Sequence, residues 1–413
     1  MKKKTVRIVI IGHVDHGKST LIGRLLLDTN SLPREKIAEI KNISRQLGKE
    51  TELAYLADQL KEEREQNKTI DTTQIFFKTR SADYVIIDAP GHAELIKNMI
   101  SGASLAQAAI LIVDAQEGIK EQTTRHAFIA RMLGIEKLIV VFNKMDLVNY
   151  DQKKFDEGKT GLTDFFAGLG LRPCCFIPIS AKADVNITGP SAMLSWYKGK
   201  SLLEALDSLK ETAGPQNRPL RLCVQDVYHL EGERIVFGKV NSGRILRGQE
   251  VVIFPQNTPA RIKQIKVFGR NLLVAREGEN IGLVLQDAPA VQRGEVVIEK
   301  NNQPLATDRF QGNLFWMSQE PLEINRPFIL RCATQEVSCH IEKVHQRINT
   351  STLQVIAENA SQLLFNEAGI VSLRTEKPLL MEKFSFIEEL GRFILERDQI
   401  QQGAGVITGD ASK

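Results

Sequence analysis

The sequence predicts an α/β domain with a mostly parallel sheet and helices on both faces, followed by two β-barrel domains. Across the first two hundred residues, short apolar runs alternate with amphipathic helical stretches, which implies crossover connections between parallel strands. After a Pro- and Gly-containing linker at residues 214–219, short alternating runs are separated by glycine turns, a pattern typical of closed β structures. The chain of 413 residues has room for about two or three such domains.

Two changes in composition set the expected domain boundaries. We predict a first domain over residues 1–213, a second over 217–302 and a third over 306–413. The expected strands are 6–11, 74–77, 84–88, 109–114, 138–142 and 176–179, then 236–240, 250–254, 281–285 and 369–373. The expected helices are 18–27, 93–104, 121–133 and 202–209. A polar insertion over residues 30–69 carries apolar residues at helical spacing and predicts a helical excursion.

Composition is that of an ordinary globular protein, with 42% hydrophobic residues, 25% charged residues and a net charge of +4. So small a net charge neither demands nor excludes a nucleic-acid partner. The five cysteines show no C-x-x-C spacing, which disfavours disulfides or structural zinc and favours a reducing cytosol. No run approaches the roughly 18 apolar residues of a membrane span. We therefore expect a cytoplasmic protein without membrane association.

Residues 12–19 read G-H-V-D-H-G-K-S and match G-x-x-x-x-G-K-[ST], the P-loop pattern, between a predicted strand and a predicted helix. That context argues against a chance match in a glycine turn. The glycines let main-chain N–H groups and the helix N-terminus face a phosphate. Lys18 would neutralise the β- and γ-phosphates, and the Ser19 hydroxyl would bind Mg²⁺. The predicted phosphate-binding residues are Gly12, His13, Val14, Asp15, His16, Gly17, Lys18, Ser19, Thr20 and Gly91.

Residues 88–92, D-A-P-G-H, follow the predicted strand at 84–88. Asp88 can hold the magnesium through a water, Gly91 can donate its N–H to the γ-phosphate, and His92 can orient the attacking water as the catalytic residue. Alone, D-x-P-G is a common turn, but its place behind a P-loop favours function. Thr69 can complete the magnesium shell, which would make the polar insertion a nucleotide-sensing switch. An ordinary loop threonine is the open alternative.

Residues 143–146, N-K-M-D, follow the predicted strand at 138–142. An Asp146 carboxylate accepts from both guanine N1–H and the 2-amino group, a pair of donors that adenine lacks. Buried polar pairing of this kind rejects a wrong partner by roughly 10⁴–10⁵. These motifs predict GTP and GDP as ligands, with Mg²⁺ as the metal. The predicted guanine-binding residues are Asn143, Lys144, Asp146, Ser180, Ala181 and Lys182.

Other candidate residues fit packing better than chemistry. The spacing of Cys339, His340 and His345 fits no structural zinc pattern. We expect ordinary structural roles for four more residues: His126, His229, Trp196 and Trp316.

The set of motifs resembles the translation elongation factors of the Tu and 1-alpha group over nearly the whole chain. Residues 60–66 and 69–71 resemble the switch-one segment of that superfamily, and residues 218–222 with 225–228 resemble the start of its second domain. This resemblance implies a GTPase. One function it allows is that of an elongation-factor-like carrier of aminoacyl-tRNA to the ribosome.

A narrower resemblance is to the large GTPase subunit of bacterial heterodimeric sulfate adenylyltransferase (ATP sulfurylase). It rests on four segments: residues 314–322, 348–353, 366–371 and 403–405. It implies a small catalytic partner subunit that makes adenosine 5′-phosphosulfate from ATP and sulfate, while GTP hydrolysis drives the unfavourable step. This is the main functional interpretation, with the tRNA carrier as its alternative and nucleic acid as a partner only there. A GTPase serving another sulfur or nucleotide pathway is a third possibility.

The sequence departs from these families at several positions. His16 stands where sulfurylase subunits often carry Asp, and Asn241 stands where tRNA carriers usually have Glu against the terminal adenosine. Lys68 replaces an isoleucine that, in the resembling GTPases, forms an apolar gate with Val14 near the catalytic histidine. An ammonium is too strongly hydrated to replace that contact. Lys68 therefore either turns to solvent, leaving the switch mobile, or reaches the γ-phosphate. No second P-loop follows, so we expect no fused kinase domain.

The His92 role gives a direct prediction. His92→Ala should lower GTP turnover by roughly 10²–10⁴, the contribution of a positioned acid–base group. Nucleotide affinity should hardly change, because the side chain acts in the transition state. Single-turnover hydrolysis and a nucleotide titration measure the two quantities. A variant that hydrolyses GTP at the parent rate removes His92 from the mechanism.

Overall fold

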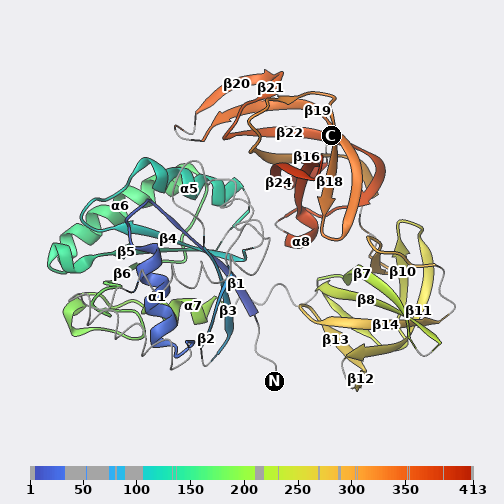
Figure 1. The fold of residues 1–413 in the computed structure, drawn as a ribbon, viewed down its shortest axis with the longest axis horizontal. Helices are drawn as coiled ribbons and strands as arrows, with labels where there is room; N and C mark the ends of the chain where they lie inside the picture. Colours follow the sequence, from blue (N-terminus) through green and yellow to red (C-terminus); the bar gives the residue numbers. More distant parts are fainter. Residues whose placement is uncertain are drawn as a thin grey trace. The chain divides into compact units, whose positions relative to one another are not determined.

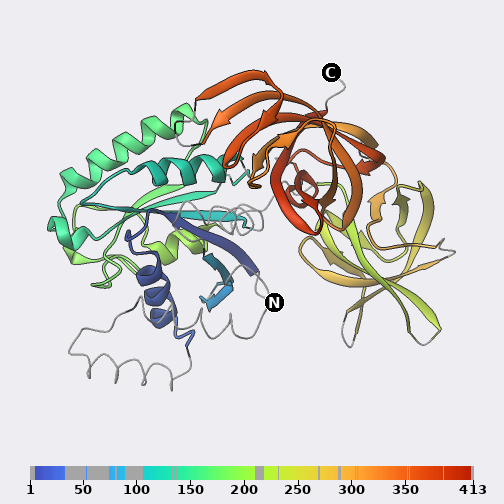
Figure 2. The ribbon, with the colours of Figure 1, turned by 45° about the horizontal axis from the view of Figure 1, so that its top comes forward.

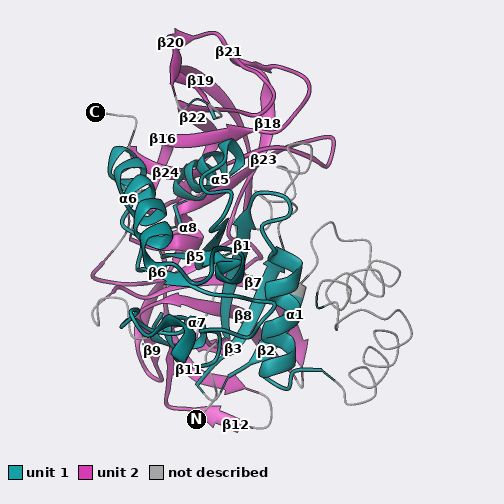
Figure 3. Ribbon diagram, turned by 90° about the vertical axis from the view of Figure 1, so that its left-hand side faces the viewer, with its two compact units in different colours: residues 1–212, 350–353 teal, residues 213–349, 354–413 magenta. Residues whose placement is uncertain are grey.

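The computed structural model describes residues 5–32, 53, 74–79, 81–88, 106–132, 134–135, 137–209, 218–230, 232–267, 270–286, 290–302, 304, 306–350, 352, 354–384 and 386–410. The chain divides into two compact units, residues 1–212 with 350–353 and residues 213–349 with 354–413 (Figure 3). None of the described helices is both long and apolar enough to cross a membrane.

The first unit is a six-stranded sheet in the order β2-β3-β1-β4-β5-β6. Only β2 is antiparallel to its neighbour, so the mostly parallel sheet is confirmed. Its strands are β1 (Thr5–Gly12), β2 (Gln74–Lys78), β3 (Asp83–Asp88), β4 (Ala108–Asp114), β5 (Leu138–Asn143) and β6 (Cys175–Pro178). Its helices are α1 (Lys18–Asp28), α5 (Glu121–Met132), α6 (Gln152–Gly168) and α7 (Leu202–Ser208), with short 3₁₀ helices η2 (Met145–Val148) and η3 (Ala192–Leu194).

Different helices cover the two faces of this sheet. Successive residues of a strand point to opposite faces, and both faces here are apolar, so the central strands are continuous apolar runs. Ile8 and Ile10 of β1 share one cluster with the buried residues of α1 and α7. Helices α5 and α6 lie over the other face (Figures 1 and 2), where Phe155 of α6 packs edge-on against Phe142 of β5.

Helix α6 has no counterpart among the predicted helices, and its sequence explains why. It has two internal glycines and only three buried residues, Phe155, Leu162 and Phe166. Both features weaken the helical signal. A Cβ atom on Gly158 would lie 2.5 Å from the Phe142 ring, so the glycine allows close packing of α6 on β5. The predicted helix at 93–104 lies outside the described residues, as does almost all of the predicted excursion at 30–69.

The second unit begins with a closed barrel. The ring runs β10-β15-β7-β8-β14-β11 and closes because β10 also pairs with β11. A separate two-stranded ribbon, β9–β13, accompanies it. These strands are β7 (Arg221–Leu230), β8 (Glu233–Ser242), β9 (Arg244–Leu246), β10 (Glu250–Phe254), β11 (Thr258–Val267), β12 (Arg270–Leu272), β13 (Val274–Arg276), β14 (Asn280–Gln286) and β15 (Val296–Glu299).

The rest of this unit forms a second closed barrel. Its ring runs β18-β23-β24-β16-β22-β19 and closes through β18–β19, so the prediction of two β-barrels is confirmed. Its elements are β16 (Ala306–Trp316), β17 (Leu322–Glu323), β18 (Pro327–Cys332), β19 (Gln335–Asn349), β20 (Val355–Ala360), β21 (Gln362–Leu363), β22 (Glu367–Leu380), α8 (Glu388–Gly391), β23 (Arg392–Arg397) and β24 (Ile400–Asp410). Trp316 is fully buried in its core, as expected of a packing residue.

A buried ion pair joins the two barrels within this unit. Arg221 of β7 is 1% exposed, and its Nε donates to Glu382 at 3.0 Å. Its Nη1 also donates to the carbonyl of Asn302 at 3.0 Å. A buried charge is stable only when paired and hydrogen-bonded, so these bonds fix Arg221 between the barrels.

Candidate guanine-nucleotide site

The predicted nucleotide motifs meet at one edge of the sheet in the first unit. The loop at 12–17 follows β1, the pair Asn143–Lys144 lies at the end of β5, and Ser180 follows β6. Strand β3 ends at Asp88, which places that residue at the same edge. Parallel strands carry their ligand sites beyond their carboxyl ends, so the topology alone assembles this site from separate segments.

The loop at 12–17 has the backbone of a phosphate cradle. Gly17 has φ +91° and Asp15 has φ +62°, conformations that curl the chain before α1 begins at Lys18. No side chain caps the N-terminus of α1. The Lys18 ammonium donates to the carbonyls of Gly12 and His13 at 2.9 and 2.8 Å, so it lies along the loop. N–H groups at a helix N-terminus beside an ammonium favour an anion.

A histidine of α5 holds the start of this loop from behind. The Nδ1 atom of His126 accepts the N–H of Gly12 at 3.1 Å, in a site where the histidine is 2% exposed. Gly12 is thus occupied at both main-chain groups, its N–H by His126 and its carbonyl by Lys18. Gly12 therefore shapes the loop, and its phosphate contact stays a prediction. His126, for which the sequence predicted an ordinary structural role, thus supports the phosphate loop.

Two other side chains also fix the loop. Gln122 of α5 contacts Nδ1 of His13 at 2.6 Å through Oε1, which also accepts the N–H of Val14 at 3.4 Å. The His16 ring is fully buried, and its Nδ1 accepts the N–H of Asp114 at 3.2 Å. Burial lowers the pKa of His16. Its side chain is thus committed to the protein interior, and only its main chain remains for the predicted phosphate contact.

Asn143 joins the phosphate loop to the guanine loop, which we define as residues 180–182. Its Nδ2 donates to the carbonyl of His16 at 2.9 Å, and its Oδ1 accepts the N–H of Ala181 at 3.0 Å. The side chain is 2% exposed, so neither bond competes with solvent. A Cβ on Gly17 would collide with the Asn143 amide, so this bridge needs glycine at 17.

Lys144 reaches back along the sheet edge. Its Nζ lies 2.8 Å from Oδ2 of Asp114, and its backbone adopts a left-handed φ of +61°. Burial alone would raise the pKa of Asp114. The bonds from Lys144 and from the N–H groups of Gln116 and Glu117 outweigh it and hold that pKa below its usual range. Asp114 is a further supporting residue that sequence analysis missed, although its place at the end of β4 was a signal.

Asp146 has a preset geometry. The Ser180 hydroxyl donates to its Oδ1 at 2.6 Å, and the N–H of Ala183 donates to the Ser180 oxygen at 3.1 Å. These bonds fix one carboxylate oxygen and leave the acid as an acceptor, the form that a guanine donor pair requires. The structure thus brings Asn143, Asp146 and the guanine loop together. The predicted residues Thr69, Lys68, Gly91 and His92 lie outside the described residues.

The described residues fit a magnesium nucleotide. The uncapped start of α1, the Lys18 ammonium and the glycine cradle at 17 are the features that suit a phosphate chain. Ser19, in the first turn of α1, offers a hard oxygen of the kind that Mg²⁺ prefers. When bound, Mg²⁺ neutralises charge on the β- and γ-phosphates.

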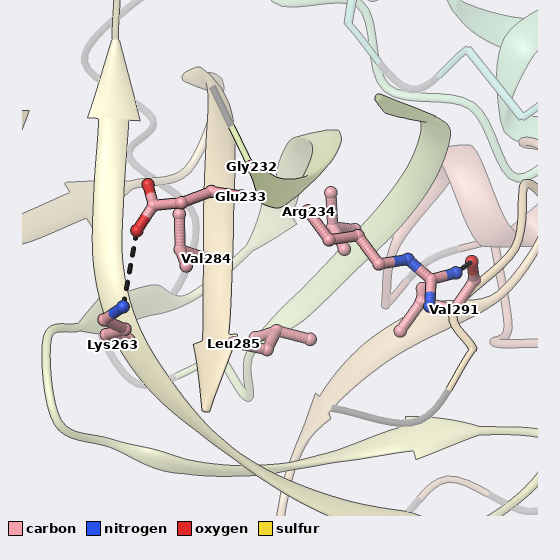
Figure 4. Close-up of a pocket in the computed structure, with 8 residues that line it drawn as sticks. Gly232, Glu233, Arg234, Lys263, Val284, Leu285 and Val291 are labelled. Atoms are coloured by element: carbon pink, nitrogen blue, oxygen red, sulfur yellow. Dashed lines mark hydrogen bonds and ion pairs between the residues drawn. The ribbon is translucent and has the colours of Figure 1, made fainter. Parts of the chain in front are cut away.

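A separate hollow of about 240 Å³ lies in the first barrel (Figure 4). Glu233 on its wall pairs with Lys263 at 3.3 Å and also with Lys266 at 2.7 Å. Arg234 donates to the carbonyl of Val291 at 2.5 Å. Glu233 is thus paired with lysines and Arg234 is bonded to a main-chain carbonyl, and none of the nucleotide motifs lies in this hollow. In the part of the chain described here, no cluster of His, Cys, Asp or Glu forms a metal site.

Comparison with known proteins agrees with this site. Residues 3–212 match the family model described as the elongation factor Tu GTP binding domain, and residues 309–408 match the GTP-eEF1A C-terminal domain-like model. Elongation factor 1-alpha of Pyrococcus furiosus is 37% identical over 418 residues, which cover 98% of this chain and 97% of that protein. That of Archaeoglobus fulgidus is 37% identical over 414 residues, with 98% of each chain covered.

Fold, site and comparisons together define a P-loop GTPase of the translation-factor type. The chain belongs to the elongation factor Tu and 1-alpha family. Its ligands are GTP and GDP, with Mg²⁺, and its activity is GTP hydrolysis.

Guanine selectivity can be tested at Asp146. Asp146→Asn presents an amide donor toward guanine donors, so GTP and GDP affinity should fall by roughly 10²–10⁴, the effect of losing two hydrogen bonds to a charged acceptor. Xanthine nucleotides should gain affinity instead. Asp156→Asn makes the same change at an exposed position on α6 and should leave the affinities for GTP and GDP unchanged. A parent protein that binds ATP and GTP equally contradicts the assignment.

Burial makes the contribution of His126 to the stability of the first unit depend on pH. Burial is the main cause that lowers its pKa to about 3, well under the ordinary value of 6.5. A depressed pKa contributes stability that is present above the unfolded value and is lost as pH falls. Between pH 7 and 5, His126 should therefore reduce the free energy of unfolding of the first unit by about 2 kcal/mol.

His126→Gln should lose that contribution while keeping an acceptor for Gly12 N–H. Chemical unfolding of parent and variant at both pH values isolates the contribution of His126. Any contribution from His16 is present in both proteins and cancels in the comparison. Identical pH dependence would mean that His126 is not neutral and buried.

Proposed function

We propose that this GTPase is an elongation-factor-like carrier that binds aminoacyl-tRNA in its GTP state and works in the cytoplasm. The observation that carries the proposal is the end-to-end similarity to proteins named elongation factor 1-alpha, at 37% identity over 98% of the chain. All three domains are included in that similarity, so more than the GTP-binding domain is shared.

A basic ribbon on the first barrel supports an RNA partner. In β9–β13, Arg244 lies directly opposite Arg276, and both side chains are exposed, as is that of the adjacent Arg247. Within the described residues, none of the three side chains has an acidic partner. Like charges directly opposite each other on paired strands are destabilising. A bound phosphate backbone would offset that repulsion, because arginine matches phosphate geometry well.

The GTPase subunit of sulfate adenylyltransferase is the second candidate, and the four segments that resemble it favour it. Most of these segments pack against one another inside the second barrel. Leu314 pairs with Gly405 on one side and with Gly369 on the other. A Cβ on Gly405 would collide with the main chain of Asn313. Residues required by barrel packing say little about a partner subunit, so we rank this candidate below the tRNA carrier.

The structural role of Asn241 removes an objection to the tRNA carrier. Its side chain is 6% exposed, and its Oδ1 accepts the N–H of Cys223 at 3.1 Å. A buried residue that satisfies a barrel strand is fixed by packing. Its departure from the glutamate of tRNA carriers is therefore weak evidence against tRNA.

Salt-dependent binding tests the proposal. With GTP present, aminoacyl-tRNA should bind with an affinity that falls steeply between 50 and 200 mM salt, by roughly 10³–10⁵ if six to ten phosphates are contacted. Arg244→Glu should weaken binding and reduce the salt slope by about one. Arg261→Glu changes the charge equally on the same barrel, but Arg261 already pairs with Glu250, so it should have little effect.

Filter binding and hydrolysis assays separate the two candidates. No binding of aminoacyl-tRNA at low salt, together with GTPase activity stimulated by a small sulfurylase subunit with ATP and sulfate, would reverse the ranking.

A further inference from the structure

An arginine of α1 binds the guanine loop through two hydrogen bonds. The Nε atom of Arg24 donates to the carbonyl of Ala181 at 3.0 Å, and its Nη2 donates to the carbonyl of Lys182 at 2.8 Å. The side chain is 15% exposed. Arg24 lies in the helix that begins at the phosphate loop, so one guanidinium connects that helix to the loop that completes the base pocket.

The chemistry of this contact needs arginine. A guanidinium has five N–H donors in a rigid plane, whereas an ammonium is a single point of charge. Two consecutive carbonyls are bound here by neighbouring donors of one plane. The third nitrogen, Nη1, lies 3.5 Å from Oδ1 of Asp28, one helical turn later. That carboxylate orients the guanidinium toward the guanine loop.

We propose that Arg24 is a positioning residue that holds the guanine loop closed and thereby sets how long a guanine nucleotide stays bound. Three side chains then hold this loop by hydrogen bonds. Arg24 donates to two of its carbonyls, Asn143 accepts the N–H of Ala181, and Asp146 accepts the hydroxyl of Ser180. Loss of the arginine anchor frees the carbonyl side, and the Ser180–Asp146 bond loosens with it. The proposal goes beyond the proposed function, because it concerns nucleotide release whichever partner the GTPase serves.

The first experiment measures GDP dissociation with a fluorescent nucleotide. Arg24→Met keeps the apolar stem and removes the donors, so GDP should leave roughly tenfold faster, the effect of one or two lost hydrogen bonds. Arg24→Lys should restore part of the loss. Arg131→Met is the matched control, because Arg131 also donates to a main-chain carbonyl, that of Leu169, outside the nucleotide site. It should leave GDP release unchanged.

A selectivity measurement separates positioning from general destabilisation. Inosine diphosphate lacks the 2-amino group that Asp146 accepts, so a loosened Ser180–Asp146 bond should narrow the preference for GDP over IDP in Arg24→Met. An unchanged preference, or GDP release at the parent rate in a folded Arg24→Met protein, would overturn the proposal.

Arg24→Lys tests the same contact with a change that keeps the positive charge. An ammonium lacks the planar pair of donors that binds two consecutive carbonyls, so GDP should leave faster than from the parent but more slowly than from Arg24→Met. GDP release from folded Arg24→Lys at the parent rate would refute the proposal, even if Arg24→Met proved unable to fold.

Discussion

The site depends on one buried amide, that of Asn143. It bonds to the phosphate loop through its nitrogen and to the guanine loop through its oxygen. Neither loop has a regular ladder of its own in which to bury its main-chain groups. A shared partner of fixed geometry satisfies both, and buried main-chain groups need such partners. Glycine at 17 follows from the same bridge, because the amide occupies the space of a Cβ. One asparagine at a strand end thus fixes the distance between the places for phosphate and base.

A second layer of polar residues behind the loops keeps them in place without facing the ligand. His126 and Gln122 act from α5, Asp114 from the end of β4, and Arg24 from α1. Each satisfies a main-chain group or a charge that would otherwise be buried alone. Because these supports are side chains of rigid helices and strands, the ligand-facing loops can remain short and glycine-rich. Preorganisation of this kind is what selective binding requires.

The sequence was sufficient to predict the sheet and the barrels and to locate the nucleotide motifs at the ends of strands, because each has a strong local signal. Apolar runs identify β1, β4 and β5, and the P-loop spacing identifies the cradle. The second layer lacks such a signal. His126 and Arg24 are single residues on helices, and their partners lie 114 and 157 positions away along the chain. Only the fold makes them neighbours. Helix α6 escaped prediction for the opposite reason, since its glycines serve close packing and weaken the local pattern.

The difference between core residues and surface residues also explains why the resemblance to the sulfate adenylyltransferase subunit says little about function. Its segments meet as neighbouring strands, and their glycines let the chains approach where side chains would collide. Any family that keeps this barrel must satisfy that constraint, whatever it binds. A binding partner contacts exposed groups instead, and Arg244 and Arg276, which face each other in β9–β13, are groups of that kind. Both arginines are exposed and, among the described residues, neither has an acidic partner, so packing does not account for them. The anionic partner proposed above would offset the repulsion between these arginines, so the evidence that bears on function lies on the surface rather than in the core.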